Sequence, residues 1–182
     1  MIDLEIITKR LKLYPLLEVD ATALYEYRSD ADVCKYQSFE PGSLDDVKKF
    51  ISGLEHDTFG IPDTWVQFGI RLRECGLLVG DLGVHFIADK PNQVEIGLTL
   101  DSNHQGNGYA TEAVKSVLEH LFVTHNTHRV FASVDPRNEP CISLLERVGM
   151  RREAHFHQSM WFKGEWVDDV VFGILESEWK SR

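Results

Sequence analysis

The sequence predicts a mixed α/β fold in which helices pack against a β-sheet. Segments with period-two alternation recur along the chain, and the strictest, "QVEIGLTL" at 93–100, is typical of a strand. Apolar residues between 110 and 121 follow the 3.6-residue period of a helix that packs on a sheet. A glycine-containing turn joins these two segments, so the strand and the helix should be neighbours in the fold.

The N-terminal half of the chain mixes strand and helix patterns. Its expected elements are a strand, two helices and two further strands, at 4–16, 20–29, 43–56, 64–73 and 77–87. Pro15 should close the first strand. Ser43 should cap the second helix, with Asp46 three positions later, and a polar and aromatic loop should connect the two helices. The two later strands should turn around 74–76.

The C-terminal half adds two helices and three strands. We expect a helix over 110–121, a strand over 129–134, a helix over 138–149, and strands over 153–162 and 166–175. Asn138 can cap the second helix, Pro140 is tolerated in its first turn, and Gly149 can end it. Lys163 and Gly164 should form the turn of a final hairpin.

The composition indicates one globular domain in a reducing compartment. A chain of 182 residues without repeats or linkers predicts a single domain over 1–182. No apolar run approaches the roughly 20 residues that span a bilayer, and the start of the chain lacks a signal-peptide pattern. Three cysteines without C-x-x-C spacing argue against a disulfide framework or structural zinc. We therefore expect a cytoplasmic protein.

The charge balance restricts the partners that the protein can bind. A formal net charge of −10 without any Lys/Arg block would repel nucleic acid and anionic lipid, so neither is expected as a partner. The same field would attract cationic substrates such as amines. An anionic cofactor would need a local positive potential.

The segment "LDSNHQGNGYATEA" has the layout of an anion site. Gly106 and Gly108 come immediately before the apolar stripe of the helix. The first amides of a helix lack intrahelical partners, and glycine lets the backbone approach a phosphate closely. An ordinary glycine turn explains the pattern equally well. A dinucleotide fingerprint fits worse because Thr111 stands where a third glycine is wanted, and a P-loop lacks its Gly-Lys-Ser/Thr.

These residues resemble the GCN5-related N-acetyltransferases. The family signature for a pyrophosphate, Gln/Arg-x-x-Gly-x-Gly/Ala, is met by Gln105, Gly108 and Ala110. Segments at 7–16, 94–100, 138–150 and 164–179 resemble the branch that contains the ribosomal-protein N-terminal acetyltransferases. The resemblance covers nearly the whole chain.

The resemblance implies a twisted, mostly antiparallel sheet with helices on both faces and a central pair of parallel strands that splays to hold acetyl-coenzyme A. It implies direct acetyl transfer to a primary amine, without a covalent acetyl-enzyme. A backbone amide at or near Leu98 would stabilise the oxyanion. The coenzyme-binding residues expected on this basis are Leu98, Leu100, Gln105, Gly106, Asn107, Gly108, Tyr109, Ala110, Thr111, Asn138 and Arg147. Asn138 would reach the pantetheine amide, whereas Arg147 would either reach the phosphates or simply be solvated.

Glu95 is the candidate general base. A primary amine must lose a proton before it attacks a thioester, and a carboxylate in direct or water-mediated reach can take that proton. Glu95 lies on the strand that would splay, two residues before Gly97. The alternative is an exposed or ion-paired strand carboxylate.

Cys141 is the candidate that protonates the leaving thiolate. Many family members use a tyrosine four positions after this site, but Leu145 stands there, so a tyrosine acid at that position is excluded. In the branch that the chain resembles, a serine occupies the place of Cys141. A thiol in the first turn of a helix should have a pKa below the free value of about 8.5. The alternative is a small residue packed beneath the pantetheine.

The residues that would bind the acceptor come from several segments. We expect Tyr36, Gln37, His85 and Asp168 around the acceptor amine, together with one aromatic residue of the final hairpin, for which Trp161 is chosen over Phe162, Trp166 and Phe172. The amine could belong to a protein N-terminus, a polyamine or amino acid, or an amino-sugar antibiotic. The branch resemblance favours a protein N-terminus. A non-catalytic acyl-coenzyme A-binding module remains the alternative from another class.

Two further features leave questions about metals and assembly. His155 and His157 would share a strand face, and His125 and His128 are helically spaced, but no carboxylate or cysteine completes a ligand set for either pair. We therefore expect no metal site. The edge of the final hairpin could pair in a homodimer or be protected by charge.

Overall fold

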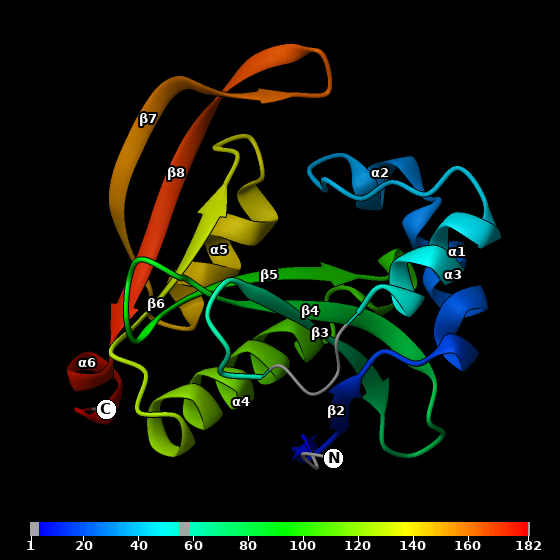
Figure 1. The fold of residues 1–182 in the computed structure, drawn as a ribbon, viewed down its shortest axis with the longest axis horizontal. Helices are drawn as coiled ribbons and strands as arrows, with labels where there is room; N and C mark the ends of the chain where they lie inside the picture. Colours follow the sequence, from blue (N-terminus) through cyan, green and yellow to red (C-terminus); the bar gives the residue numbers. More distant parts are fainter. Residues whose placement is uncertain (1–3, 55–58, 182) are drawn as a thin grey trace.

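A computed structural model describes residues 4–54 and 59–181 of the chain. Its described strands form one sheet in the order β1-β2-β3-β4-β5-β6-β8-β7 (Figure 1). The strands are β1 (Ile6–Ile7), β2 (Leu11–Pro15), β3 (Thr64–Leu72), β4 (Leu78–Phe86), β5 (Gln93–Leu100), β6 (Arg129–Val134), β7 (Arg151–Phe162) and β8 (Glu165–Leu175). The α-helices are α1 (Ala21–Arg28), α2 (Ala31–Cys34), α3 (Leu44–Ser52), α4 (Tyr109–Thr124), α5 (Glu139–Arg147) and α6 (Glu176–Lys180). Short 3-10 turns at Glu18–Asp20 and Ser102–His104 complete the set.

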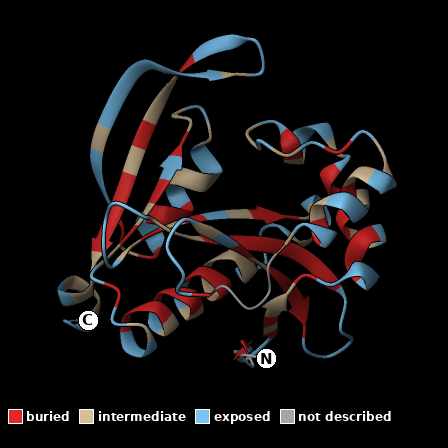
Figure 2. Cartoon of the chain, in the orientation of Figure 1, coloured by how far each residue is buried: buried red, intermediate tan, exposed pale blue. Residues whose placement is uncertain are grey.

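Helices cover both faces of this sheet, as predicted. The buried stripe of α4, including Val114, Leu118 and Leu121, packs into the larger apolar cluster. Helices α1 and α3 pack into a second cluster, and Arg28 of α1 binds Asp81 of β4, whereas the next residue of β4, Leu82, belongs to the first cluster. Because adjacent strand residues point to opposite faces, the two clusters lie on opposite sides of β4. Figure 2 shows the buried centre of the sheet and the exposed end of the β7–β8 hairpin.

The boundaries of several elements differ from the predictions. The first predicted strand is a hairpin of β1 and β2, because the Thr8 hydroxyl accepts from the Leu11 amide at 2.9 Å and closes a turn. The predicted loop after α1 contains α2, whose start is capped by Asp30. Helix α3 begins at the predicted Ser43 cap but ends at Ser52, where Gly53 follows. The predicted residues 55 and 56 lie outside the described residues.

A buried ion pair fixes α1 to the sheet. Asp81 on β4 is fully buried and accepts from Arg28 of α1 at 2.6 Å (Nη2) and 3.2 Å (Nε). The hydroxyl of Tyr27 donates to the same carboxylate at 2.6 Å, and the Gln67 side chain also donates to it. Burial and the neighbouring carboxylate raise the pKa of Tyr27 well above its usual value. Arg28 also donates to the Phe39 carbonyl, so the cluster anchors the segment that follows α2.

The parallel strands β5 and β6 separate within their length, as predicted. Their paired positions run only from Gln93 opposite Arg129 to Glu95 opposite Phe131, although both strands continue beyond these residues. Every other neighbouring pair in the sheet is antiparallel. The sheet therefore opens just after Glu95. Among the described residues, no helix has the length and apolar character needed to cross a membrane.

Candidate active site

The turn before α4 is shaped to receive an anion. Gly106 and Gly108 have φ angles of 75° and 79°, in the left-handed region where glycine is favoured, and Gly108 caps α4. Consecutive amides in such a turn, at the positive end of a helix of 16 residues, form a concave donor surface. The side chain of Gln105 donates to the Leu100 carbonyl at 3.1 Å and ties the turn to the end of β5.

A cleft of about 780 Å³ extends from this turn to the opening between β5 and β6. Its wall includes ten of the eleven residues expected to bind the coenzyme: Leu98, Leu100, Gln105, Gly106, Gly108, Tyr109, Ala110, Thr111, Asn138 and Arg147. Asn107 is not on this wall. Its side-chain nitrogen, Nδ2, turns back and donates to the carbonyls of His104 and Gln105. A role of Asn107 in binding the coenzyme therefore stays a prediction for its main-chain amide.

Two arginines bring positive charge to the cleft, in a protein that is strongly acidic as a whole. Arg137, which sequence reasoning missed, is held by Asp135 at 2.6 Å and by Glu165 at 2.9 Å. Arg147 reaches the Thr111 hydroxyl at 3.5 Å and has no ion pair with any described residue. The charge of Arg147 is therefore less compensated than that of Arg137, so Arg147 is better able to bind an anionic ligand.

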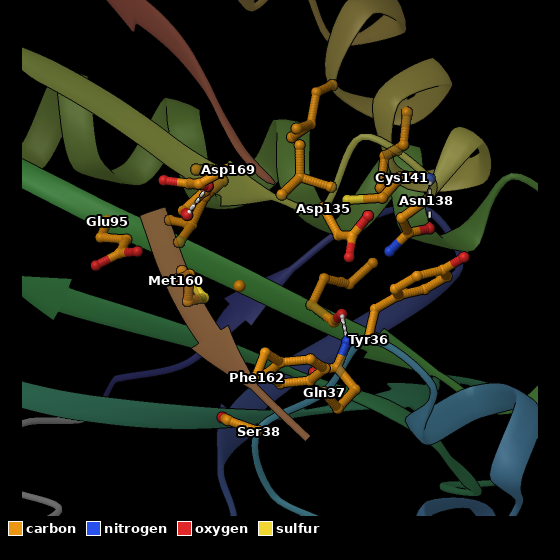
Figure 3. Close-up of a pocket in the computed structure, with 18 of the residues that line it drawn as sticks. Tyr36, Gln37, Ser38, Glu95, Asp135, Asn138, Cys141, Met160, Phe162 and Asp169 are labelled. Carbon is orange, nitrogen blue, oxygen red and sulfur yellow. Dashed lines mark hydrogen bonds between the residues drawn. The ribbon is translucent and has the colours of Figure 1, made fainter. Parts of the chain in front are cut away.

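A second pocket of about 310 Å³ lies where β5 and β6 separate, with Glu95 of β5 and Asp135, which follows β6, on its wall (Figure 3). Both cavities share six wall residues: Tyr36, Gln37, Leu98, Asn138, Cys141 and Leu144. Gln37 donates to the Leu98 carbonyl at 3.3 Å, and Tyr36 donates to the Arg137 carbonyl at 3.1 Å. The two cavities therefore meet where the sheet is open. At this point a ligand bound in one cavity could transfer a chemical group to a ligand bound in the other.

Glu95 lies in the wall of the second pocket, away from Cys141 and Asn138 (Figure 3). Burial raises the pKa of its carboxyl group, and the charge of Asp169 adds to this effect, while His85 and Lys90 oppose it. The nearest contact of Glu95 to His85 is 3.7 Å, to Nδ1. A partly desolvated carboxylate at the open end of a split sheet is suited to accept a proton.

Cys141 lies in the first turn of α5, but its pKa is shifted in the opposite direction from the prediction. Asn138 caps the helix by accepting from the Cys141 amide at 3.3 Å, as expected. Burial of the thiol raises its pKa to about 11, because desolvation of the thiolate outweighs the field of a short helix. Complete proton transfer to a thiolate with a pKa of about 8.5 would cost about 3 kcal/mol, so the Cys141 thiol can donate a hydrogen bond more readily than its proton.

This pKa predicts slow alkylation of Cys141. At pH 8 only about one thiol in a thousand would be ionised, whereas Cys75 is exposed. Iodoacetamide should modify Cys141 in the Cys75→Ser protein at least 100-fold more slowly than it modifies Cys75 in the Cys141→Ser protein, as followed by mass spectrometry. Comparable rates at the two sites would contradict the raised pKa.

Of the five residues predicted for the acceptor, three line the second pocket, Gln37 among them, and two do not. Tyr36 and Asp168 line the second pocket. His85 does not line it, but stacks on Trp65, with ring centroids 4.6 Å apart, and has Asp63 at 3.5 Å. Trp161 is 60% exposed and packs against Trp166, so its prediction is wrong.

The alternation of β7 explains the misplaced tryptophan. Met160 and Phe162 line the pocket, and Trp161 between them points to the opposite face. Sequence reasoning also missed Asp135 and Asp169, which line the same pocket. If the register of the hairpin had been known, the alternation of β7 would have identified Met160 and would have favoured Phe162 over Trp161.

The structure also corrects the treatment of the two histidine pairs. Asp168 on β8 accepts from His155 at 2.7 Å and from His157 at 3.1 Å, so a carboxylate does complete that pair. The other pair does not form, because α4 ends at Thr124 and the His125 ring packs against Phe59. The expectation that neither pair has a third ligand is therefore wrong for His155 and His157.

Comparison with known proteins identifies relatives of this chain. The family model of the acetyltransferase (GNAT) domain matches residues 10–151. The uncharacterized N-acetyltransferase YnaD of Bacillus subtilis is 34% identical over 176 residues, covering 97% of this chain and 99% of the relative. A GNAT-family acetyltransferase structure from Bacillus anthracis has a TM-score of 0.85 at 30% identity, over 96% of this chain and 100% of that one. Spermidine N(1)-acetyltransferase of Vibrio cholerae is 26% identical over 95% of this chain and 97% of its own.

Proposed function

This chain belongs to the GNAT family of acetyltransferases, which use acetyl-coenzyme A, and we propose that it acetylates a cationic primary amine by direct transfer. The observation that carries this proposal is the meeting of the two cavities at the opening between β5 and β6. One cavity begins at a glycine turn suited to a pyrophosphate, and the other contains a desolvated carboxylate suited to an amine. Donor and acceptor would therefore bind together, and no covalent acetyl-enzyme is needed.

The coenzyme would bind through main-chain and uncharged groups more than through charges. The amides from Gly106 to Thr111 would hold the pyrophosphate, with Arg147 beside them. Asn138 would hydrogen-bond the pantetheine arm. The bound coenzyme supplies the thioester, and the Leu98 amide would stabilise the negative charge that develops on its carbonyl oxygen.

Glu95 would take the proton of the acceptor. A primary amine has a pKa of about 10.4 and is charged at neutral pH, so it must be deprotonated before it attacks. Glu95 accepts this proton as the amine nitrogen becomes nucleophilic. Cys141 would then donate a hydrogen bond to the leaving sulfur, and its high pKa makes it a stabilising donor more than a full acid.

The walls of the second pocket favour a cationic acceptor with an apolar body. Four carboxylates line it, from Glu95, Asp135, Asp168 and Asp169, together with apolar side chains of Trp65, Met160 and Phe162. Carboxylates attract ammonium groups, and apolar walls pack against methylene groups. A protein N-terminus and a polyamine both satisfy this description. The protein N-terminus is the first candidate. The polyamine is the second candidate, supported by the several carboxylates of the pocket and by the likeness to a spermidine acetyltransferase.

The proposal predicts turnover with amines and a preference for a second positive charge. Acetyl-coenzyme A would be offered with ribosomal-protein N-terminal peptides, spermidine, an amino-sugar antibiotic, and the matched pair cadaverine and pentylamine, with detection of free thiol. Cadaverine should have a KM about tenfold lower than pentylamine, because its second ammonium can pair with the acidic wall. Equal KM values would contradict the role of that wall. Coenzyme binding by calorimetry without thiol release from any amine would favour a non-catalytic acyl-coenzyme A-binding module.

The compartment, the domain organisation and the oligomeric state of the enzyme are also proposals. The three cysteines are free thiols in the structure, which supports the cytoplasm as its compartment. The single domain over 1–182 remains a proposal, supported by one sheet that includes strands from both halves of the described chain. Strand β7 is an outer strand of that sheet and could pair in a homodimer.

A further inference from the structure

We propose that His155, His157 and Asp168 form a binding site for one divalent transition-metal ion, with Zn²⁺ as the representative ion. The inference does not depend on acetyl transfer. His155 and His157 lie on β7, and Asp168 lies on the neighbouring strand β8. One ligand atom from each residue lies within 4.8 Å of the other two.

The local backbone brings these three side chains together. The pairing of β7 with β8 is interrupted between Phe156 and Met160, where Gln158 has a φ angle of 46°. The Gln158 amide donates to Asp168 Oδ1 at 2.8 Å, so the irregular segment is fastened to the carboxylate of the opposite strand. Asp168 Oδ2 then faces both imidazoles, whose ring centroids are 4.3 Å apart. The ligand atoms are thus held in place before any ion binds.

The donor set identifies the class of ion. Two imidazole nitrogens and one carboxylate oxygen suit Zn²⁺, Co²⁺, Ni²⁺ or Cu²⁺, whereas Ca²⁺ and Mg²⁺ prefer oxygen ligands alone. Three protein ligands leave one or more coordination positions for water, as in open zinc sites.

Arg152 opposes metal binding in the structure and supplies a sharp test. Its guanidinium Nη2 lies 2.8 Å from His155 Nδ1, and because a guanidinium can only donate, Nδ1 must be the acceptor. The proton of a neutral His155 ring is then on Nε2, where it is donated to Asp168. An ion bound at Nε2 would displace this proton to Nδ1, so Arg152 must move aside. Removal of the Arg152 guanidinium should therefore tighten metal binding.

The test is Zn²⁺ binding by calorimetry, with Co²⁺ visible absorption as a second measurement, on chelator-treated protein made without a polyhistidine tag. One equivalent of Zn²⁺ should bind to the wild-type protein. The variants His155→Ala, His157→Ala and Asp168→Asn should each bind Zn²⁺ at least tenfold more weakly. Arg152→Ala should bind at least threefold more tightly. His104→Ala is the matched control, because His104 contacts a single carboxylate, Asp101 at 2.8 Å, and its loss should leave the affinity unchanged.

Several outcomes would overturn the site. These are no binding at micromolar Zn²⁺, equal binding in the wild type and all three ligand variants, or a loss of affinity in His104→Ala as large as in His157→Ala. An affinity that is unchanged or weaker in Arg152→Ala would also contradict it, because coordination through His155 Nε2 requires the opposite. Far-UV circular dichroism of each metal-free variant shows whether a loss of binding comes from unfolding.

Discussion

Replacement of Glu95 with glutamine should lower kcat for amine acetylation by about 10²- to 10⁴-fold, the usual contribution of a general base. Glutamine keeps the size of the side chain but cannot accept the proton of the ammonium group. The affinity for acetyl-coenzyme A, measured by calorimetry, should stay within about twofold, because Glu95 lines the proposed acceptor pocket and not the proposed coenzyme cleft. Steady-state kinetics with the best amine of the panel would measure the effect.

The pH dependence gives an independent check on the same residue. The base must be ionised to act, so the rate should fall as the pH decreases through the pKa of Glu95, which burial raises above 4.5. His85, Lys90 and Asp169 are the charged or titratable groups that act on this carboxylate, and Asp63 in turn contacts His85. Glu95→Gln should lose this acidic limb of the profile. An unchanged kcat and pH profile in the variant would show that Glu95 is not the base.

Replacement of Asp81 with alanine should have the largest effect on stability, about 3–5 kcal/mol lost from the free energy of unfolding. The change leaves the buried Arg28 cation without its carboxylate and removes the acceptor of the Tyr27 hydroxyl. Urea denaturation with a constant m-value would measure the loss.

Two variants serve as controls for the Asp81 prediction. Glu176→Ala removes a surface ion pair with Lys180 and should cost less than about 1 kcal/mol. The double variant Arg28→Met, Asp81→Leu removes both buried charges and should be clearly more stable than Asp81→Ala. A loss below about 1 kcal/mol in Asp81→Ala would mean that the buried pair contributes little to the fold.

Local sequence patterns predicted the parts of this fold that local forces determine. The alternation of 93–100, the apolar stripe of α4 and the caps at Ser43 and Asn138 all depend on residues within a few positions of one another. The turn at Gly106 and Gly108 belongs to the same class, since its conformation depends on the absence of a side chain. Of these features, those from β5 to the start of α4 form one side of the cleft of about 780 Å³.

The parts that were predicted wrongly depend on long-range packing or register. Trp161 was assigned to the pocket because the sequence does not show which face of β7 is turned inward. The carboxylate of Asp168 reaches two histidines only through the irregular pairing around Gln158. The pKa of Cys141 was predicted from the helix terminus, whereas burial by residues distant in sequence reverses the shift.

If the two cavities hold the donor and the acceptor as proposed, the six residues common to both mean that the two ligands do not have separate recognition surfaces. Tyr36 and Gln37 face both chambers, and the segment that carries them is anchored to the sheet through Arg28 and Asp81. A substitution at this common boundary that admits a new amine will also alter the fit of the acyl carrier. Natural or engineered changes of substrate that preserve coenzyme affinity should therefore arise at the outer rim, around Met160 and Phe162, before they arise at Tyr36 or Gln37.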